Sequence, residues 1–204
     1  MEPDTAAYVA VMNEIKRRVK VVHALHNKDA NLLYGATQIE SMVLQIRMIL
    51  ELVMLSTLAA NRSLFEQQKQ KFEKHWHPAK IMSDVAKLNP SFYPVPIKEL
   101  PSSHPGVARD LLEIKSGFLK ADQLVALHGR CGDLLHAKNP FGKSADYKLY
   151  ERMVPEWLEQ IRALLNCHQI RLLDQNTFHL VHMSEQPGDV VRIYTFRSDG
   201  PVCA

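Results

Sequence analysis

The sequence predicts an all-α protein: a helical bundle followed by a short C-terminal β-hairpin. Apolar residues recur every three or four positions along most of the first 170 residues or so, which is the period of an amphipathic helix. The period changes after residue 175, where two β-rich runs, 177–183 and 190–196, flank a segment containing Pro-Gly-Asp. We therefore expect a bundle over residues 1–174 and a hairpin over residues 175–204. Because a two-stranded hairpin is marginal alone, it should pack on the bundle or on a partner subunit.

The composition is that of a globular protein, with 46% hydrophobic and 23% charged residues in a chain of 204. The net charge of +3 permits an anionic partner such as RNA without requiring one. Three widely separated cysteines indicate no disulfide framework, and the N-terminus lacks a signal-peptide pattern, so a cytoplasmic location is expected. The most hydrophobic run, 48–60, is too short to cross a bilayer and predicts a core helix rather than a membrane anchor.

The first predicted helix covers residues 5–26. Its apolar side repeats at three and four positions, and its other side is basic. The basic residues are Lys16, Arg17, Arg18 and Lys20. They form either a solvated face or a track for the phosphate backbone of a nucleic acid.

The second predicted helix, 31–61, is apolar on almost every side, which is typical of a helix buried on most faces. Its exceptions are Glu40, Arg47 and Glu51. Arg47 and Glu51 stand four residues apart, so they can pair with each other. The pair is either a structural ion pair or a support for catalytic residues elsewhere.

Two shorter helices are expected at 64–75 and 78–88. Five prolines in 89–106 exclude a helix there and predict a stiff, extended connection, either a crossover loop or a partner-binding segment. Helical spacing resumes at 107–118 and 120–138. The last helix, about 147–173, should be capped by Ser144 or Asp146, and Pro155 inside it predicts a kink or a late start.

The helix 120–138 carries the residues of greatest chemical interest. At about 100° per residue, Arg130, Asp133 and His136 fall together opposite the apolar side, spread over roughly 120°. Gly129 and Gly132 lie beside or at the edge of this trio, which would let another backbone or a ligand approach closely. An arginine offers a planar fork for phosphate oxygens, and a histidine can transfer protons near neutral pH.

The Arg-x5-His spacing from Arg130 to His136, with Asn139-Pro140 directly after it, resembles the HEPN superfamily. HEPN proteins (higher eukaryotes and prokaryotes nucleotide-binding) are all-α bundles, and many are metal-independent ribonucleases with an Arg-x(4–6)-His motif. The resemblance covers residues 5–174. It implies an endoribonuclease that works as a homodimer with two motif helices meeting across a two-fold axis. It also suggests a toxin–antitoxin or phage-defence setting, with an antitoxin protein as a possible partner.

The resemblance assigns roles to the motif residues. His136 would exchange a proton with the ribose 2′-hydroxyl or the leaving oxygen, and Arg130 would hold the scissile phosphate. Asp133 either orients one of these side chains or is an ordinary acidic residue on the helix surface. No metal or cofactor is expected, because the sequence offers no carboxylates or Cys/His ligands at metal spacing.

Four further residues are assigned to the same site. The stretch 46–51 is similar to helices that pack beside the HEPN motif, so Arg47 and Glu51 would orient Arg130 or His136. Lys138 and Asn139, directly after the motif, are predicted to bind substrate.

Two other interpretations remain open. The chain could be a non-catalytic module that binds a nucleotide, RNA or a protein partner, since a fold does not fix a function. It could also be an unrelated helical bundle in which the Arg-x5-His spacing is a coincidence.

Overall fold

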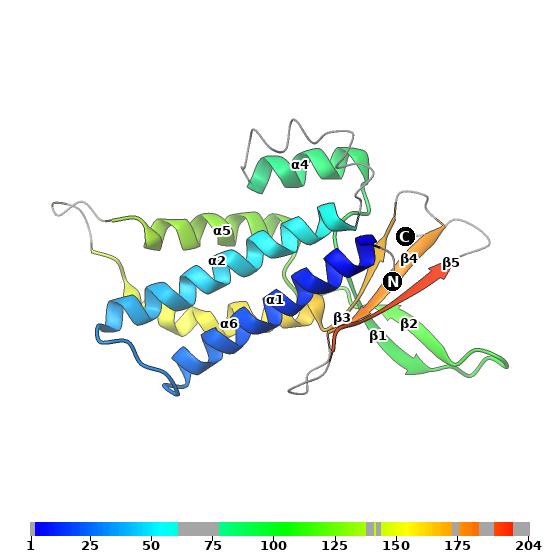
Figure 1. The fold of residues 1–204 in the computed structure, drawn as a ribbon, viewed down its shortest axis with the longest axis horizontal. Coiled ribbons are helices and arrows are strands. Elements are labelled where there is room, and N and C mark those ends of the chain that lie inside the picture. The colour runs from blue at the N-terminus through cyan, green and yellow to red at the C-terminus, as the bar shows by residue number, and fades with distance from the viewer. Residues whose placement is uncertain are drawn as a thin grey trace.

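The computed structural model describes residues 3–60, 78–137, 141, 144–172, 176–183 and 190–197 (Figure 1). This part of the chain forms five helices and a five-stranded antiparallel sheet. The all-α prediction is therefore wrong, because the protein is a mixed α/β structure. The helix predicted at 64–75 lies outside the described residues.

Four helices form a bundle: α1 (Pro3–His26), α2 (Gly35–Ala59), α5 (Ala121–Leu135) and α6 (Tyr147–Leu165). Helix α2 is central, because each of the other three packs against it. A shorter helix, α4 (Pro78–Leu88), packs against α2 (Figure 1). The apolar character of α2 follows from this central position, since Ile46, Ile49 and Leu50 are fully buried.

Helix α2 is also long and apolar enough, by length and composition alone, to cross a membrane, and is the one described helix with that property. That observation is weak support for membrane insertion, because 56% of the stretch is buried inside the fold. The core helix of a globular protein has the same length and composition.

The sheet has the strand order β2-β1-β3-β4-β5, and every neighbouring pair is antiparallel. The strands are β1 (Val95–Pro101), β2 (Arg109–Glu113), β3 (Cys167–Arg171), β4 (Thr177–His182) and β5 (Arg192–Arg197). Figure 1 places the sheet at one end of the bundle, where α6 leads directly into β3.

The proline-rich connection is extended, as predicted, but it contains a strand in the middle of the sheet. The two ladders of β1 are offset, because residues 97–101 pair with β2 whereas Val95 and Pro96 pair with β3. The register changes at Pro96, whose carbonyl also accepts a hydrogen bond from the Ile114 N–H at 2.9 Å, and proline occurs inside a sheet where the regular ladder is interrupted.

Two predicted helical segments are strands instead. Within 107–118 the chain forms β2, an edge strand with Leu112 half exposed. The last helix ends at Leu165, and the following residues form β3, which is buried on both faces. A buried strand lacks the alternation of polar and apolar residues that identifies a strand in sequence, and short apolar runs are ambiguous between helix and strand.

The C-terminal runs do form an antiparallel hairpin, β4–β5, in which Phe178 and Phe196 stack with ring centroids 5.1 Å apart. The hairpin is continuous with the rest of the sheet, because β4 also pairs along its whole length with β3. Ile170 of β3 and Val181 of β4 belong to the same hydrophobic core as the helices.

A buried hydrogen-bond chain ties α1 to the sheet. Tyr8 and His168 are both almost fully buried, and the Tyr8 hydroxyl lies 2.7 Å from His168 Nε2. His168 Nδ1 lies 2.7 Å from the Leu165 carbonyl oxygen, which can only accept, so Nδ1 carries the proton and Nε2 accepts from Tyr8. Burial lowers the pKa of His168 to about 4, which keeps the imidazole neutral.

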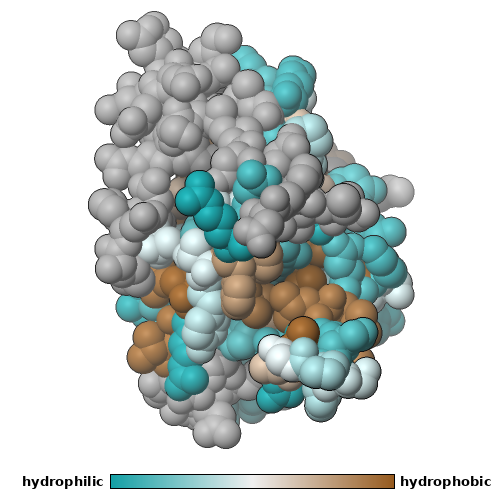
Figure 2. All heavy atoms as spheres, turned by 90° about the vertical axis from the view of Figure 1, so that its right-hand side faces the viewer, coloured by the Kyte–Doolittle hydropathy of each residue, from teal (hydrophilic) through white to brown (hydrophobic). Residues whose placement is uncertain are grey.

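Apolar side chains gather on the face of the molecule at its sheet end (Figure 2). The outer strands contribute exposed apolar residues, with Leu112 on β2 and Tyr194 and Phe196 on β5 each more than 40% exposed. Apolar surface of this kind is common where one chain meets another.

Candidate functional site

Helix α5 carries the motif and is oriented by its apolar side. Leu124, Leu127, Cys131 and Leu134 are buried against the bundle, as predicted, and Leu135 is partly buried. The Gln123 side chain accepts a hydrogen bond from the Lys120 N–H at 3.0 Å and so completes the first turn. Arg130 and Asp133 consequently lie on the exposed side of α5.

His136 does not lie on the helix. Helix α5 ends at Leu135, and His136 follows with an extended backbone (φ −80°, ψ 139°) while its N–H still bonds to the Gly132 carbonyl at 3.3 Å. The prediction of a helix through residue 138 is wrong at this end, although His136 remains exposed and close in sequence to the other two motif residues. Lys138 and Asn139 lie outside the described residues.

A mostly buried cluster of charged and polar groups joins α2 to α5. Arg47 Nε lies 3.3 Å from Glu51 Oε1, so the predicted contact between these two residues is present. The same carboxylate oxygen lies 2.9 Å from Nε2 of His128 on α5. Sequence reasoning missed His128. Its position four residues before Gly132, on the same side of the helix, is the signal that could have indicated it.

The two motif glycines have different surroundings. A Cβ built on Gly132 would lie 2.7 Å from Arg47 Nη1, so the absence of a side chain makes room for the guanidinium group of Arg47. The expectation that Gly132 admits another backbone or a ligand is therefore corrected. A Cβ on Gly129 would meet no atom of the described residues within 4 Å, so the described part of the chain leaves that part of the α5 surface open.

Two arginines border the exposed strip of α5. Viewed along the helix axis at 100° per residue, Gly129 and Asp133 lie between Arg130 on one side and Gly132 on the other. Arg47 rests against Gly132 and so borders the strip on that side. Burial raises the pKa of the Cys131 thiol to about 12, and the positive charges of Arg47 and Arg130 both oppose that increase. Both charges therefore act on the same turn of α5.

Helix α6 holds Arg130 from the other side. The Tyr150 hydroxyl donates to the Arg130 carbonyl at 3.1 Å, and Arg130 Nη1 lies 3.8 Å from the Met153 sulfur. Desolvation, and then the negative charge of Asp133, raise the pKa of Tyr150, so its hydroxyl remains protonated and able to donate. Tyr150 is a second residue that sequence reasoning missed. The C-terminal end of α5 lies at the end of the bundle opposite the sheet (Figure 1).

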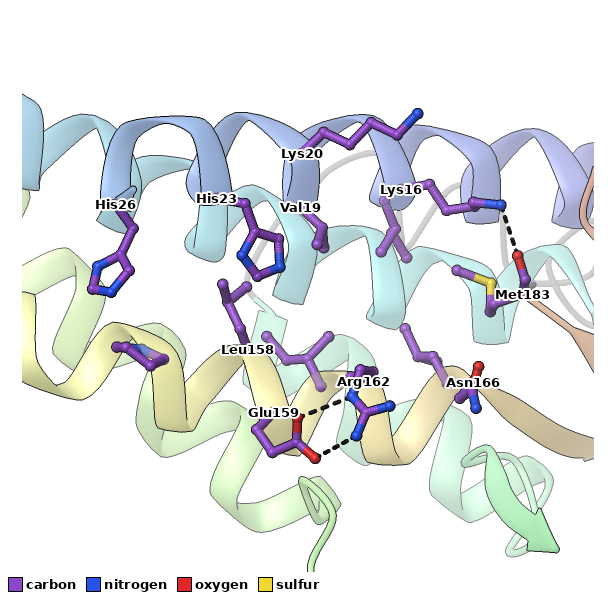
Figure 3. Close-up of a pocket in the computed structure, with 14 residues that line it drawn as sticks. Lys16, Val19, Lys20, His23, His26, Leu158, Glu159, Arg162, Asn166 and Met183 are labelled. Atoms are coloured by element: carbon purple, nitrogen blue, oxygen red, sulfur yellow. Dashed lines mark hydrogen bonds and ion pairs between the residues drawn. The ribbon is translucent and has the colours of Figure 1, made fainter. Parts of the chain in front are cut away.

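A separate pocket of about 490 Å³ lies between α1 and α6 (Figure 3). Its apolar lining includes Ile15, Val19, Leu158, Ile161 and Leu165, and its basic residues are Lys16, Lys20, His23, His26 and Arg162. Figure 3 shows the rings of His23 and His26 directed from α1 toward α6, whereas the Lys20 ammonium points away.

The basic run on α1 is divided between two surroundings. Lys16 lines the pocket and donates to the Met183 carbonyl at 2.8 Å. Arg17 and Arg18 instead pair with Glu14, each at 2.9 Å. The run is therefore not a single continuous track of unpaired cations.

No protein-family model matches the chain, and no curated protein or solved structure matches it either. The HEPN resemblance accordingly rests on the motif residues alone.

Proposed function

We propose that the chain is a metal-independent endoribonuclease of HEPN type and that the exposed strip of α5 is its active site. One observation carries the proposal. Arg130 and Arg47 border an open strip of helix on which Asp133 lies, and His136 follows at the same end of α5. Two guanidinium groups on either side of an unobstructed surface suit a bridging phosphate, whose oxygens accept paired N–H groups.

Arg130 would bind the scissile phosphate and offset the charge that develops on its oxygens in the transition state. The Met153 sulfur contacts the guanidinium of this arginine, and the Tyr150 hydroxyl holds its backbone carbonyl. Arg47, held by Glu51 and seated on Gly132, would supply a second positive charge. A pre-positioned cation costs less reorganisation during the reaction than a mobile one.

His136 would perform the proton transfers. As a base it takes the proton of the ribose 2′-hydroxyl, whose oxygen attacks the phosphorus while the 5′-oxygen of the next nucleotide leaves and receives a proton. The products are a 2′,3′-cyclic phosphate and a 5′-hydroxyl end. Asp133, on the same strip, would orient His136 or Arg130.

A homodimer would complete the site, because one arginine pair and one histidine make a sparse catalytic set. Two α5 helices meeting at the open surface beside Gly129 would bring two such sets together. The HEPN resemblance supports a cytoplasmic toxin or phage-defence protein, with RNA as substrate and an antitoxin as partner.

Purified protein incubated with mixed RNA in EDTA tests the proposal. We expect cleavage to persist, to yield 2′,3′-cyclic phosphate ends and to spare DNA, which lacks the 2′-hydroxyl. His136→Ala should lower the rate by about 10² to 10⁴, the usual effect of losing an acid–base group. His104→Ala, an exposed histidine on the loop between β1 and β2, should cleave at the wild-type rate.

RNA that is bound but stays intact would favour a second candidate, a module that binds a nucleotide-sized anion. The α1–α6 pocket supports this function, because its volume suits a small ligand and the rings of His23 and His26 point from α1 toward its apolar lining (Figure 3). Titration with nucleoside monophosphates tests it, with His23→Glu expected to weaken binding and His104→Glu expected to leave it unchanged.

A further inference from the structure

Three residues far apart in the sequence come together on the sheet. Cys167 of β3 and His182 of β4 are direct cross-strand partners. Glu99 lies on β1, on the other side of β3 in the sheet. The Cys167 sulfur, the His182 ring nitrogen and a Glu99 carboxylate oxygen all lie within 4.8 Å of one another, and His182 Nε2 is 3.5 Å from Glu99 Oε1.

We propose that Glu99, Cys167 and His182 bind a divalent transition-metal ion, and that zinc is the ion that fits. A thiolate, an imidazole and a carboxylate are the three ligand types that zinc accepts together. Magnesium and calcium prefer oxygen ligands alone, so a cysteine in the set disfavours them.

The spacing is close to that of an assembled site. In a tetrahedral zinc site, bond lengths of about 2.0–2.3 Å place the ligand atoms about 3.5 Å apart. The His182–Glu99 distance of 3.5 Å already meets this value. The other distances between the ligand atoms are at most 4.8 Å. Side-chain shifts on the order of 1 Å would therefore bring all three ligand atoms to bonding distance from one ion.

The three side chains do not meet one another's hydrogen-bonding needs. His182 Nε2 is buried, and no hydrogen-bond partner for it lies among the described residues, since its 3.5 Å approach to Glu99 is too long for a good hydrogen bond. A bound cation would give this imidazole nitrogen a partner and would offset the negative charge of Glu99.

The neighbouring residues support a defined geometry. The Tyr194 ring meets the His182 ring edge-on, with centroids 5.4 Å apart, which restrains the imidazole. Three protein ligands leave a fourth position for water or another molecule. Because the ligands come from β1, β3 and β4, the ion would join three strands of the sheet.

This site is independent of the proposed active site. Arg130 lies in the C-terminal half of α5 and His136 follows its last residue, and the C-terminal end of this helix lies away from the sheet (Figure 1). Metal binding and RNA cleavage can therefore be measured separately on the same preparation, and the failure of one leaves the other standing.

Titration of the reduced, metal-free full chain with Co²⁺, followed by absorption spectroscopy, tests the site. We expect one equivalent to produce a near-ultraviolet thiolate-to-cobalt band that Zn²⁺ abolishes by displacement. Cys167→Ser and His182→Gln should remove the band, and Glu99→Gln should weaken Co²⁺ binding at least about tenfold. Cys203→Ser and His104→Gln should each keep the wild-type signal.

Thermal unfolding of the same proteins gives a second measurement. Zn²⁺ should raise the melting temperature of the wild type and leave that of Cys167→Ser unchanged, because an ion that binds only the folded state stabilises it. The proposal is overturned if Co²⁺ gives no thiolate band with the wild type. It is also overturned if the band survives in a folded Cys167→Ser variant or disappears in Cys203→Ser.

Discussion

Glu51 holds two partners from two helices with one carboxylate oxygen, Arg47 within α2 and His128 on α5. Its side chain is only 18% exposed, so these contacts replace most of the water that would otherwise solvate the charge. The arrangement fixes the guanidinium of Arg47 against Gly132. The position of Arg47 beside α5 therefore depends on these few contacts. Two pairs of substitutions test the roles of Gly132 and Arg130 on this surface.

Gly132→Ala should displace Arg47, because the new methyl group would lie 2.7 Å from Nη1. The guanidinium is the far end of a flexible side chain, so the fold should survive, while RNA cleavage should fall about ten- to a hundredfold from misplacement of the cation. Gly129→Ala is the matched control, since its methyl group would have no neighbour within 4 Å in the part of the chain that the structure describes. Single-turnover cleavage rates compare the two variants, and equal activity in both would remove Arg47 from the site.

Arg130→Lys should lower the cleavage rate at least about tenfold, because an ammonium group cannot donate two parallel hydrogen bonds to a phosphate. The Tyr150 hydrogen bond goes to the backbone carbonyl of residue 130, so the substitution leaves that contact in place. Arg152→Lys, at an exposed position on α6, should keep wild-type activity. Unimpaired cleavage by Arg130→Lys would show that residue 130 contributes only its charge.

The elements differ in how far sequence could predict them. The central helix α2 and the β4–β5 pair follow directly from apolar periodicity. Strand β3 could not be found in that way, because His168, Gln169 and Arg171 are buried polar residues whose partners lie in distant segments. Strand β1 was obscured by prolines that the offset of its two ladders accommodates.

The buried hydrogen bond between Tyr8 on α1 and His168 on β3 can be tested by substitution. Tyr8→Phe should lower the free energy of unfolding by about 1–3 kcal/mol, because it leaves the buried His168 Nε2 without a donor. Urea unfolding measures the change. Tyr34→Phe, at an exposed tyrosine before α2, should shift the free energy by less than about 0.5 kcal/mol. Equal stabilities for the two variants would contradict the role of the Tyr8 hydroxyl.

The whole molecule combines a bundle and a sheet, and we propose one site on each; the sequence predicted the site on the bundle but not the site on the sheet. Periodicity placed Arg130 and Asp133 on the exposed side of α5, but His136 lies beyond the helix end. The metal-ligand cluster was not anticipated, because Glu99 and Cys167 come together only through the β1–β3 pairing. Ligands supplied by neighbouring strands show no fixed spacing in sequence, unlike ligands on one helix.

The intact protein is predicted to associate with a second copy of itself. We expect a two-fold dimer at micromolar concentration in which the open α5 surfaces face each other. Ala126→Trp, at an exposed position on α5, should shift sedimentation toward monomer by placing a large side chain in the contact. Ala108→Trp, on the exposed loop before β2, should leave the dimer intact. A wild-type protein that sediments only as monomer would leave the α5 site without its second half.

The order of the strands bears on how the chain is synthesised and folds. Val95 pairs with Gln169, so the β1–β3 ladder cannot form until 74 further residues have left the ribosome. Until then β1 and β2 form a hairpin in which the edge of β1 that later pairs with β3 has no strand partner. Such an unpaired edge can add a strand from another chain. A nascent or prematurely terminated chain of about 165 residues would therefore be far more prone to aggregate than the finished protein, and its need for a chaperone would end when β3 docks.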